Sequence, residues 1–144
     1  CKLPSDRVLC YPYPKIMPVE TPWGAMKDSL TYMCVVDQQQ KQKNKIIEDP
    51  ASFGDWQRVA TFGGKLAENC TQAVARDFLA AGMWSAENAG YPVVLHVHDE
   101  IGSEVKKGFG DLKEFERRCS AMPAWAAGLP VVAKGYRAER YKKE

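Results

Sequence analysis

The sequence predicts an α+β fold, in which an antiparallel sheet carries helices packed on one face. Short apolar, β-branched runs precede one long stretch of helix-forming residues, 65–89. After the helix comes the run 93–100, which starts apolar and ends in charged residues. The next segment, 101–105, alternates apolar and polar residues, so we expect the two segments to form a β-hairpin. A second helical pattern, 109–122, and a closing apolar run, 129–133, complete an order close to a split βαβ or ferredoxin-like layout.

The first sixty residues combine strand candidates with a proline-rich segment. The runs 8–11, 30–36 and 56–62 are candidates for strands, although the last could instead be a turn. The segment 12–22 contains four prolines, and because proline removes a backbone donor we expect an extended loop there. The polar run 38–45 carries three lysines, so a solvated loop and a phosphate-contacting loop both remain open.

The long helix is predicted to have two faces, and a glycine, Gly90, should end it. Spacings of three and four place apolar side chains together and predict a stripe that packs on the core. A polar stripe on another face is either the solvated side of the helix or a DNA-contacting face, since Lys and Arg neutralise phosphates and Asn and Gln can donate to minor-groove acceptors. The apolar stripe is Leu66, Cys70, Ala73, Val74, Ala81 and Trp84, and the polar stripe is Lys65, Asn69, Gln72 and Arg76.

The composition argues against some classes of protein but does not establish one. The length of 144 residues suits one domain, and a net charge of +2 is too small to establish a nucleic-acid partner. The five cysteines are odd in number and form no CxxC pair, which argues against a disulfide framework or a zinc ribbon and for a reducing compartment. Because the first residue is Cys1 and not methionine, we expect a fragment, a processed product or one piece of a split protein.

Both histidines lie next to two carboxylates at the end of the run 93–100. The apolar part predicts a buried strand, and because side chains alternate along a strand, His96 and His98 should share one face. Asp99 and Glu100 should form a turn, since charged groups are rarely buried unpaired. Their oxygens are hard ligands that suit Mg²⁺ or Mn²⁺, so this tip could supply half of a phosphoryl-transfer site.

Other interpretations of the tip remain open. His96 and His98 could bind zinc or iron together with Asp99, although a third nitrogen ligand is missing. The tip could also be a hydrogen-bonded polar turn without chemistry. A two-metal site would need further carboxylates that hold the ions about 4 Å apart. The remaining candidates, expected to be plain surface acids, are Glu48, Asp49 and Asp111.

Several stretches resemble one family. The run His96-Val97-His98-Asp99-Glu100 is similar to motif C of the family A (polymerase-I-like) DNA polymerases, which reads Gln or His followed by Val-His-Asp-Glu in the palm domain. Residues 62–77 resemble the helix before motif C in bacteriophage members of the family. Three further segments also resemble the family, with Asp6 where it often has glycine and Tyr136 where the phage version often has tryptophan. These segments are 3–9, 125–130 and 135–137.

The resemblance implies that residues 1–144 form a single domain, the C-terminal part of a polymerase palm, without fingers, thumb or exonuclease regions. It implies that Asp99 is the catalytic aspartate that binds Mg²⁺ in a two-metal site, with Glu100 as its supporting carboxylate. His98 would lie beside the primer terminus, and Gln72 would reach the primer–template duplex. The residues expected to contact nucleic acid are His98, His96, Gln72, Lys65, Asn69 and Arg76.

The resemblance also implies partners. The second metal-binding aspartate, from motif A, and the nucleotide-binding motif B have no counterpart in the chain, so we expect another polymerase segment to supply them and no polymerisation by this chain alone. The substrates would be primer–template DNA and a deoxynucleotide, and a phage-encoded enzyme would act in the bacterial cytoplasm. Two alternatives are a non-catalytic DNA-binding or scaffolding remnant of a polymerase, and a small stand-alone metal-dependent hydrolase.

Overall fold

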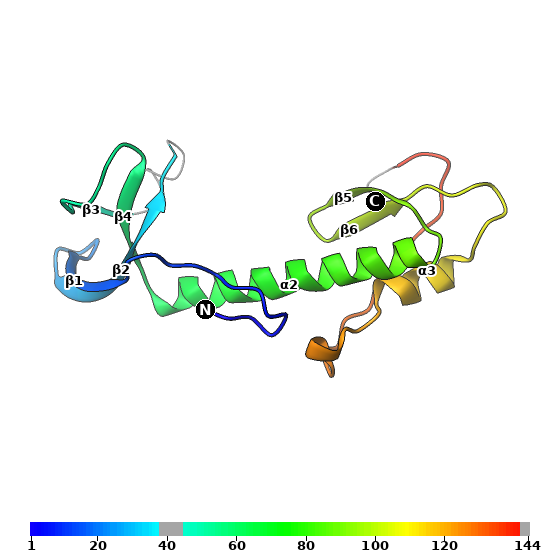
Figure 1. The fold of residues 1–144 in the computed structure, drawn as a ribbon, viewed down its shortest axis with the longest axis horizontal. Coiled ribbons are helices and arrows are strands. Elements are labelled where there is room, and N and C mark those ends of the chain that lie inside the picture. Colours follow the sequence, from blue (N-terminus) through cyan, green and yellow to red (C-terminus); the bar gives the residue numbers. More distant parts are fainter. Residues whose placement is uncertain (38–44, 142–144) are drawn as a thin grey trace. The chain divides into compact units, whose positions relative to one another are not determined.

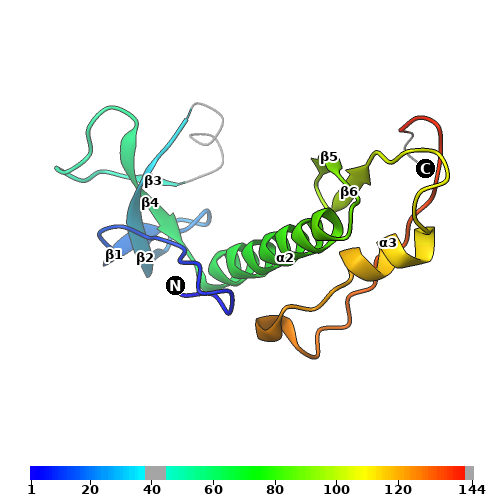
Figure 2. The ribbon, with the colours of Figure 1, turned by 45° about the vertical axis from the view of Figure 1, so that its right-hand side comes forward.

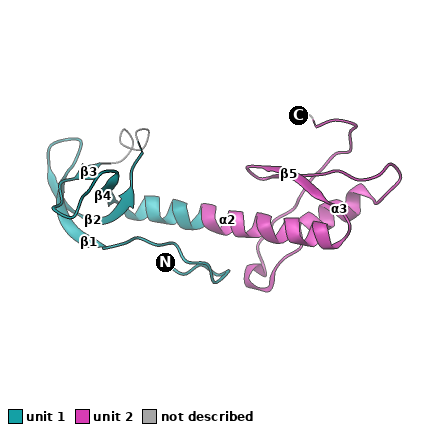
Figure 3. Cartoon of the chain, turned by 45° about the horizontal axis from the view of Figure 1, so that its top comes forward, with its two compact units in different colours: residues 1–71 teal, residues 72–144 magenta. Residues whose placement is uncertain are grey.

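The computed structural model describes residues 1–37 and 45–141. It contains antiparallel sheets and two α-helices, which confirms the predicted α+β class (Figure 1). The internal contacts divide the chain into two compact units, residues 1–71 and 72–144, each of which is described separately below (Figure 3). The expectation of a single domain stays a prediction.

The first unit is built on a four-stranded antiparallel sheet in the order β1-β2-β4-β3. Its strands are β1 (Lys15–Glu20), β2 (Met26–Val35), β3 (Ile46–Ile47) and β4 (Trp56–Thr61). The strands predicted over 30–36 and 56–62 are therefore confirmed, the first with an earlier start. The lysines at 41 and 43 lie outside the described residues, as do those at 142 and 143 near the C-terminal end of the sequence.

The proline-rich segment 12–22 is not the loop that the sequence predicts. It contains β1, which pairs along β2 with Pro18 opposite Asp28. β1 is an edge strand, where a missing N–H does not break the ladder on both sides, and this is where sheets tolerate proline. The strand predicted over 8–11 is also wrong, because only an isolated bridge between Lys2 and Val8 forms there.

Asp49, expected at the surface, is instead buried in an ion pair. The Arg58 Nε lies 2.5 Å from Asp49 Oδ2, and both side chains are less than 5% exposed. Arg58 Nη1 also donates to the Tyr13 carbonyl and to Thr31 Oγ1, at 2.9 and 3.1 Å. The Ala51 amide and the Arg58 guanidinium both donate to the carboxylate and hold the pKa of Asp49 below its ordinary value. Such pairing is what allows these charges to be buried.

The long helix, α2 (Gly63–Asn88), agrees with the predicted range to within two residues at each end. It ends as predicted, at a glycine with left-handed backbone, Gly90, whose φ is +85°. The amide of Tyr91 bonds to the Ala86 carbonyl and that of Gly90 to the Glu87 carbonyl, which is a Schellman cap. This turn directs the chain from the helix into the hairpin that follows.

The buried positions of α2 are small residues, namely Ala73, Gly82 and Ala86. A Cβ on Gly82 would lie 2.7 Å from the Cys119 carbonyl oxygen, so the glycine allows the next helix to approach closely. Trp84 is 72% exposed, which contradicts its place in the predicted stripe. It lies two residues from both Gly82 and Ala86, and thus on the opposite side of the helix. The other stripe residues are half-buried: Leu66, Cys70, Val74 and Ala81.

The core of the second unit forms around Tyr91, which is 3% exposed. Its ring centroid lies 5.3 Å from that of Phe109 and 5.2 Å from that of Phe115. The second helix, α3 (Leu112–Cys119), is shorter than the predicted 109–122, because Asp111 caps its first turn by accepting from the Glu114 amide.

No strand forms in the described part of the C-terminal segment, so the closing strand predicted over 129–133 is wrong. A short 3₁₀ helix, η1 (Ala124–Ala126), follows α3. The segment is held by side chains of α3 and its cap. Ser120 Oγ accepts from the Ala133 amide at 2.8 Å, and Glu116 Oε1 accepts from the Gly135 amide at 2.9 Å. These bonds replace the ladder that the apolar pattern predicts.

Candidate functional site

The acidic tip is the turn of a β-hairpin in the second unit. Its strands, β5 (Val93–Val97) and β6 (Glu100–Ser103), form a two-stranded antiparallel sheet beside the C-terminal part of α2 (Figures 1 and 2). Val97 pairs with Glu100, so His98 and Asp99 form a two-residue turn. The predicted hairpin is confirmed, but the turn lies one residue earlier than the predicted pair of acids, and Glu100 is the first residue of β6.

Only part of the hairpin packs on the core. Val93 and Ile101 contact the cluster around Tyr91, whereas Val94, His96 and Val97 are exposed. The prediction of a buried strand is therefore wrong. An irregular register between Val93 and Leu95 marks a bulge near the base. The tip extends beyond the core, and its polar side chains are open to solvent.

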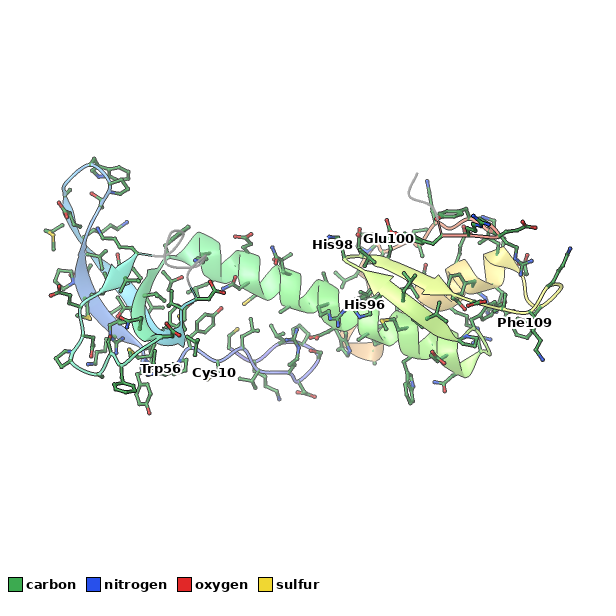
Figure 4. The ribbon with its side chains drawn as sticks, turned by 90° about the horizontal axis from the view of Figure 1, so that it is seen from above. Cys10, Trp56, His96, His98, Glu100 and Phe109 are labelled. Atoms are coloured by element: carbon green, nitrogen blue, oxygen red, sulfur yellow. The ribbon has the colours of Figure 1, made fainter. Side chains whose placement is uncertain are left out.

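His98 has a left-handed backbone with φ of +54°. It is the first residue of the turn, a position where two-residue hairpin turns require positive φ and where glycine is common. Strand alternation ends at Val97, so the prediction that His96 and His98 share one strand face is wrong. Figure 4 shows both histidines near the tip together with Glu100. A histidine held in this conformation costs energy that a glycine would avoid.

The two carboxylates of the tip differ in their surroundings. Both are exposed. The Tyr141 hydroxyl donates to Glu100 Oε2 at 2.6 Å. This bond is the main cause that raises the pKa of Tyr141, and desolvation and the nearby negative charge raise it further. Within residues 1–37 and 45–141, no hydrogen bond or ion pair engages the Asp99 carboxylate. Asp99 thus presents two oxygens that could bind a cation, while Glu100 is oriented by a tyrosine.

Part of the predicted polar stripe lies against the hairpin. Arg76 Nη1 is 3.4 Å from His96 Nδ1, so α2 and β5 bring one cation and one imidazole together. Gln72 is exposed in the same unit. Lys65 and Asn69 belong to the first unit, where the Asn69 side-chain amide donates to the Tyr11 hydroxyl at 3.2 Å. The Asn69 side chain is therefore engaged within the protein, as are those of Arg76 and His96.

A complete metal site is not found in the described residues. No group of three or more His, Cys, Asp or Glu side chains there could hold a metal ion. This gives no support to a zinc or iron site formed by His96, His98 and Asp99. The donor set of Asp99 and Glu100 does fit part of a magnesium site, since Mg²⁺ takes one or two carboxylates and fills its other positions with water and substrate phosphates.

Tyr141 is a site residue that sequence reasoning missed. It lies 41 residues after Glu100, in a segment without helix or strand. No spacing or periodicity links two residues so far apart. Only the course of the C-terminal segment brings the hydroxyl to the carboxylate.

The chain is similar to a DNA polymerase. That protein is the DNA polymerase of Bacillus phage SP02, to which the chain is 38% identical over 143 residues. The match covers 99% of this chain and 19% of the phage protein, so the chain spans about a fifth of the length of the relative. No protein-family model matches the chain, and no solved structure matches it.

Neither α2 nor any other helix of the described residues is both long and apolar enough to cross a bilayer.

Proposed function

We propose that this chain is the C-terminal palm segment of a phage-type family A DNA polymerase, and that it contributes Asp99 to two-metal nucleotidyl transfer. The similarity to the phage SP02 polymerase along 143 residues carries this proposal. The hairpin supports it, because its two-residue turn exposes Asp99 to solvent and the exposed Glu100 follows at the start of β6. The reaction would join the primer 3′-hydroxyl to the α-phosphate of a deoxynucleotide, with release of pyrophosphate.

In this proposal each carboxylate of the tip has a separate role. Asp99 would be a ligand of Mg²⁺, and its lack of partners among the described residues leaves its oxygens available. Glu100 would support the site, and the Tyr141 hydroxyl would fix its orientation. Bound Mg²⁺ supplies positive charge that stabilises the developing charge on the phosphoryl oxygens.

The duplex would lie against α2 and the turn. Arg76 offers a cation for a DNA phosphate, and its contact with His96 orients both side chains. Gln72 lies one helical turn before Arg76 and could donate to minor-groove acceptors. The His98 imidazole, next to Asp99 in the turn, would contact the primer end.

The proposal requires a partner segment. The donor set of the tip is only part of a two-metal site, so a second aspartate must come from elsewhere. We propose that a segment carrying motifs A and B supplies it, together with the nucleotide-binding side chains. Without that segment the chain is expected to show no polymerase activity.

Complementation tests the proposal. The chain is mixed with a polymerase segment that carries motifs A and B, and extension of a labelled primer is measured. We expect activity from the mixture only, and its loss with Asp99→Ala. Glu104→Ala is the matched control, because Glu104 is an exposed acid just after β6 and has no assigned role. An active mixture in which Asp99→Ala equals Glu104→Ala would exclude the role of Asp99.

A non-catalytic DNA-binding segment is the second candidate. The exposed Gln72 and Arg76 side chains on α2, which suit a duplex without any metal, favour it. It predicts duplex binding that weakens steeply with salt and does not change with Asp99→Ala. Because the first candidate predicts loss of primer extension with the same variant, one set of proteins distinguishes the two.

A further inference from the structure

The first unit contains a pocket of about 370 Å³, and all of the lining residues belong to that unit. Its volume is at the lower end of the range of about 300–1,000 Å³ that is usual for small-ligand sites. The pocket lies on the sheet face that carries Met33 and Arg58, which are directly paired across β2 and β4. The lining residues are Tyr13, Lys15, Met33, Ala51, Trp56 and Arg58.

The walls combine aromatic rings with positive charge. Trp56 is half-buried and Tyr13 is 70% exposed, so both present aromatic surface near the pocket. Two cations, Lys15 and Arg58, meet a single carboxylate, Asp49. Asp49 is 2.5 Å from the buried Arg58 but 3.7 Å from the Lys15 ammonium group, whose side chain is 59% exposed. Because these two cations share the Asp49 carboxylate, the group keeps a net positive charge, and the exposed Lys15 ammonium can also be reached by an anion from solvent.

This combination fits a nucleotide. Aromatic side chains that stack on bases, next to cations that contact phosphates, are the shared feature of sites for single-stranded nucleic acid. Base stacking is tolerant of sequence, which suits a chain that must accept any template. An acidic peptide would use the charge of Lys15 but would leave the rings of Trp56 and Tyr13 without a planar partner.

We propose that this pocket binds an unpaired nucleotide of single-stranded DNA, with its base against Trp56 or Tyr13 and its phosphate at Lys15. The inference rests on the proposed function for the choice of DNA as the ligand. Arg58 and Asp49 are positioning residues in this proposal, since their pairing fixes the pocket wall.

The test is binding of the whole chain to a fluorescein-labelled oligothymidylate of about 12 nucleotides, within the usual site sizes of about 4–16. Fluorescence anisotropy is measured at several salt concentrations. We expect Trp56→Ala to weaken binding about 5- to 150-fold, the range for loss of one stacked base, and Trp56→Phe to retain most of the affinity. We expect Lys15→Ala to lower the slope of log affinity against log salt by about 0.7, the value for one phosphate contact on a single strand.

Matched controls use the same residue types in the same unit. Trp23→Ala removes a tryptophan that is 79% exposed and does not line the pocket, and it should not change the affinity. Lys27→Ala removes an exposed lysine of β2 and should not change the salt slope. Circular dichroism of each variant checks the fold. If Trp56→Ala unfolds the chain, the Lys15→Ala slope still decides the outcome.

Three results would overturn the inference. The first is equal binding by wild type, Trp56→Ala and Lys15→Ala. The second is equal weakening by Trp56→Ala and Trp23→Ala. The third is competition by polyglutamate of the same length as strong as that by unlabelled oligothymidylate, which would mean that the pocket recognises charge alone.

Failure of this inference can be told apart from failure of the proposed function. Loss of primer extension with Asp99→Ala supports the polymerase assignment, whatever the pocket binds. Conversely, oligothymidylate binding that depends on Trp56 and Lys15 supports the pocket even if Asp99→Ala leaves extension unchanged. Duplex DNA provides a further comparison, because the pocket variants should weaken binding of the single strand and leave duplex binding unchanged.

Discussion

Replacing His98 by glycine is expected to stabilise the hairpin while it impairs the proposed function. His98 has φ of +54° in the turn between β5 and β6. A left-handed backbone conformation costs a residue with a Cβ about 1–2 kcal/mol, whereas glycine adopts this conformation without strain. The imidazole would nevertheless be missing from the primer side of the proposed site.

The magnitude follows from two opposing terms. Relief of about 1–2 kcal/mol is partly offset by the greater entropy that glycine loses on folding, about 0.5–1 kcal/mol. The net expectation for His98→Gly is a gain of up to about 1.5 kcal/mol in the free energy of unfolding. The same substitution at His96, in β5 and without positive φ, brings no relief and should lower that free energy by about 0.5–1 kcal/mol.

The assay is urea unfolding by circular dichroism, together with hydrogen exchange of the amides that pair across β5 and β6. The two His→Gly variants should differ by about 1–2 kcal/mol and have opposite signs relative to wild type. His98→Val should be the least stable of the turn variants, because a β-branched residue tolerates positive φ poorly. A loss of stability in His98→Gly as large as that in His96→Gly would refute the reasoning.

Three further predictions concern the scaffold. The pKa of Asp49 in the folded chain lies below its ordinary value of 3.8. The Asp49 carboxylate therefore stabilises the fold above pH 3.8, and this stabilisation is lost as the pH falls through the lower pKa of the folded state. Asp49→Asn should remove the corresponding part of the acid dependence of the urea midpoint. Tyr91→Phe should destabilise by about 1–3 kcal/mol in urea unfolding, because the Tyr91 hydroxyl accepts a partly buried hydrogen bond from the Asp111 amide at 3.1 Å. An unchanged urea midpoint would contradict this expectation. Gly82→Ala should lower the melting temperature. Overpacking of the new Cβ against the Cys119 carbonyl costs about 1–3 kcal/mol, which exceeds the gain of about 1 kcal/mol in helix propensity. A higher melting temperature would show that the two helices separate easily.

The elements with strong local signals could be predicted from the sequence. The helix α2 has a long uninterrupted run of helix formers and a glycine at its end, and both features act locally. The hairpin at 93–103 follows from an apolar β-branched run, a polar tip and an alternating return. The acidic character of the tip is likewise a local property of the sequence, although the exact turn residues depend on the pairing of Val97 with Glu100.

The features that depend on distant residues could not be predicted. β1 exists because β2 lies beside it, and four prolines in the segment hide its strand pattern. The Asp49 side chain is buried because it forms an ion pair with Arg58, and no local pattern indicates this pairing. No local pattern indicates the contact of Tyr141 with Glu100 either. Nor does any local pattern indicate that small residues, and not Trp84, lie on the packed side of α2. In each case a tertiary contact outweighs the local propensity.

Mapping the metal in the reconstituted enzyme tests the role of Asp99 most directly. Fe²⁺ replaces Mg²⁺ in the mixture of this chain with the segment carrying motifs A and B, in the presence of DNA, and peroxide with ascorbate then cleaves the backbone near the bound iron. We predict cleavage of this chain at the hairpin turn, next to Asp99, and its loss in Asp99→Asn but not in Asp28→Asn, an exposed aspartate of β2. Cleavage at the turn that persists in Asp99→Asn, or cleavage confined to other parts of the chain, would contradict the assignment of Asp99 as a metal ligand.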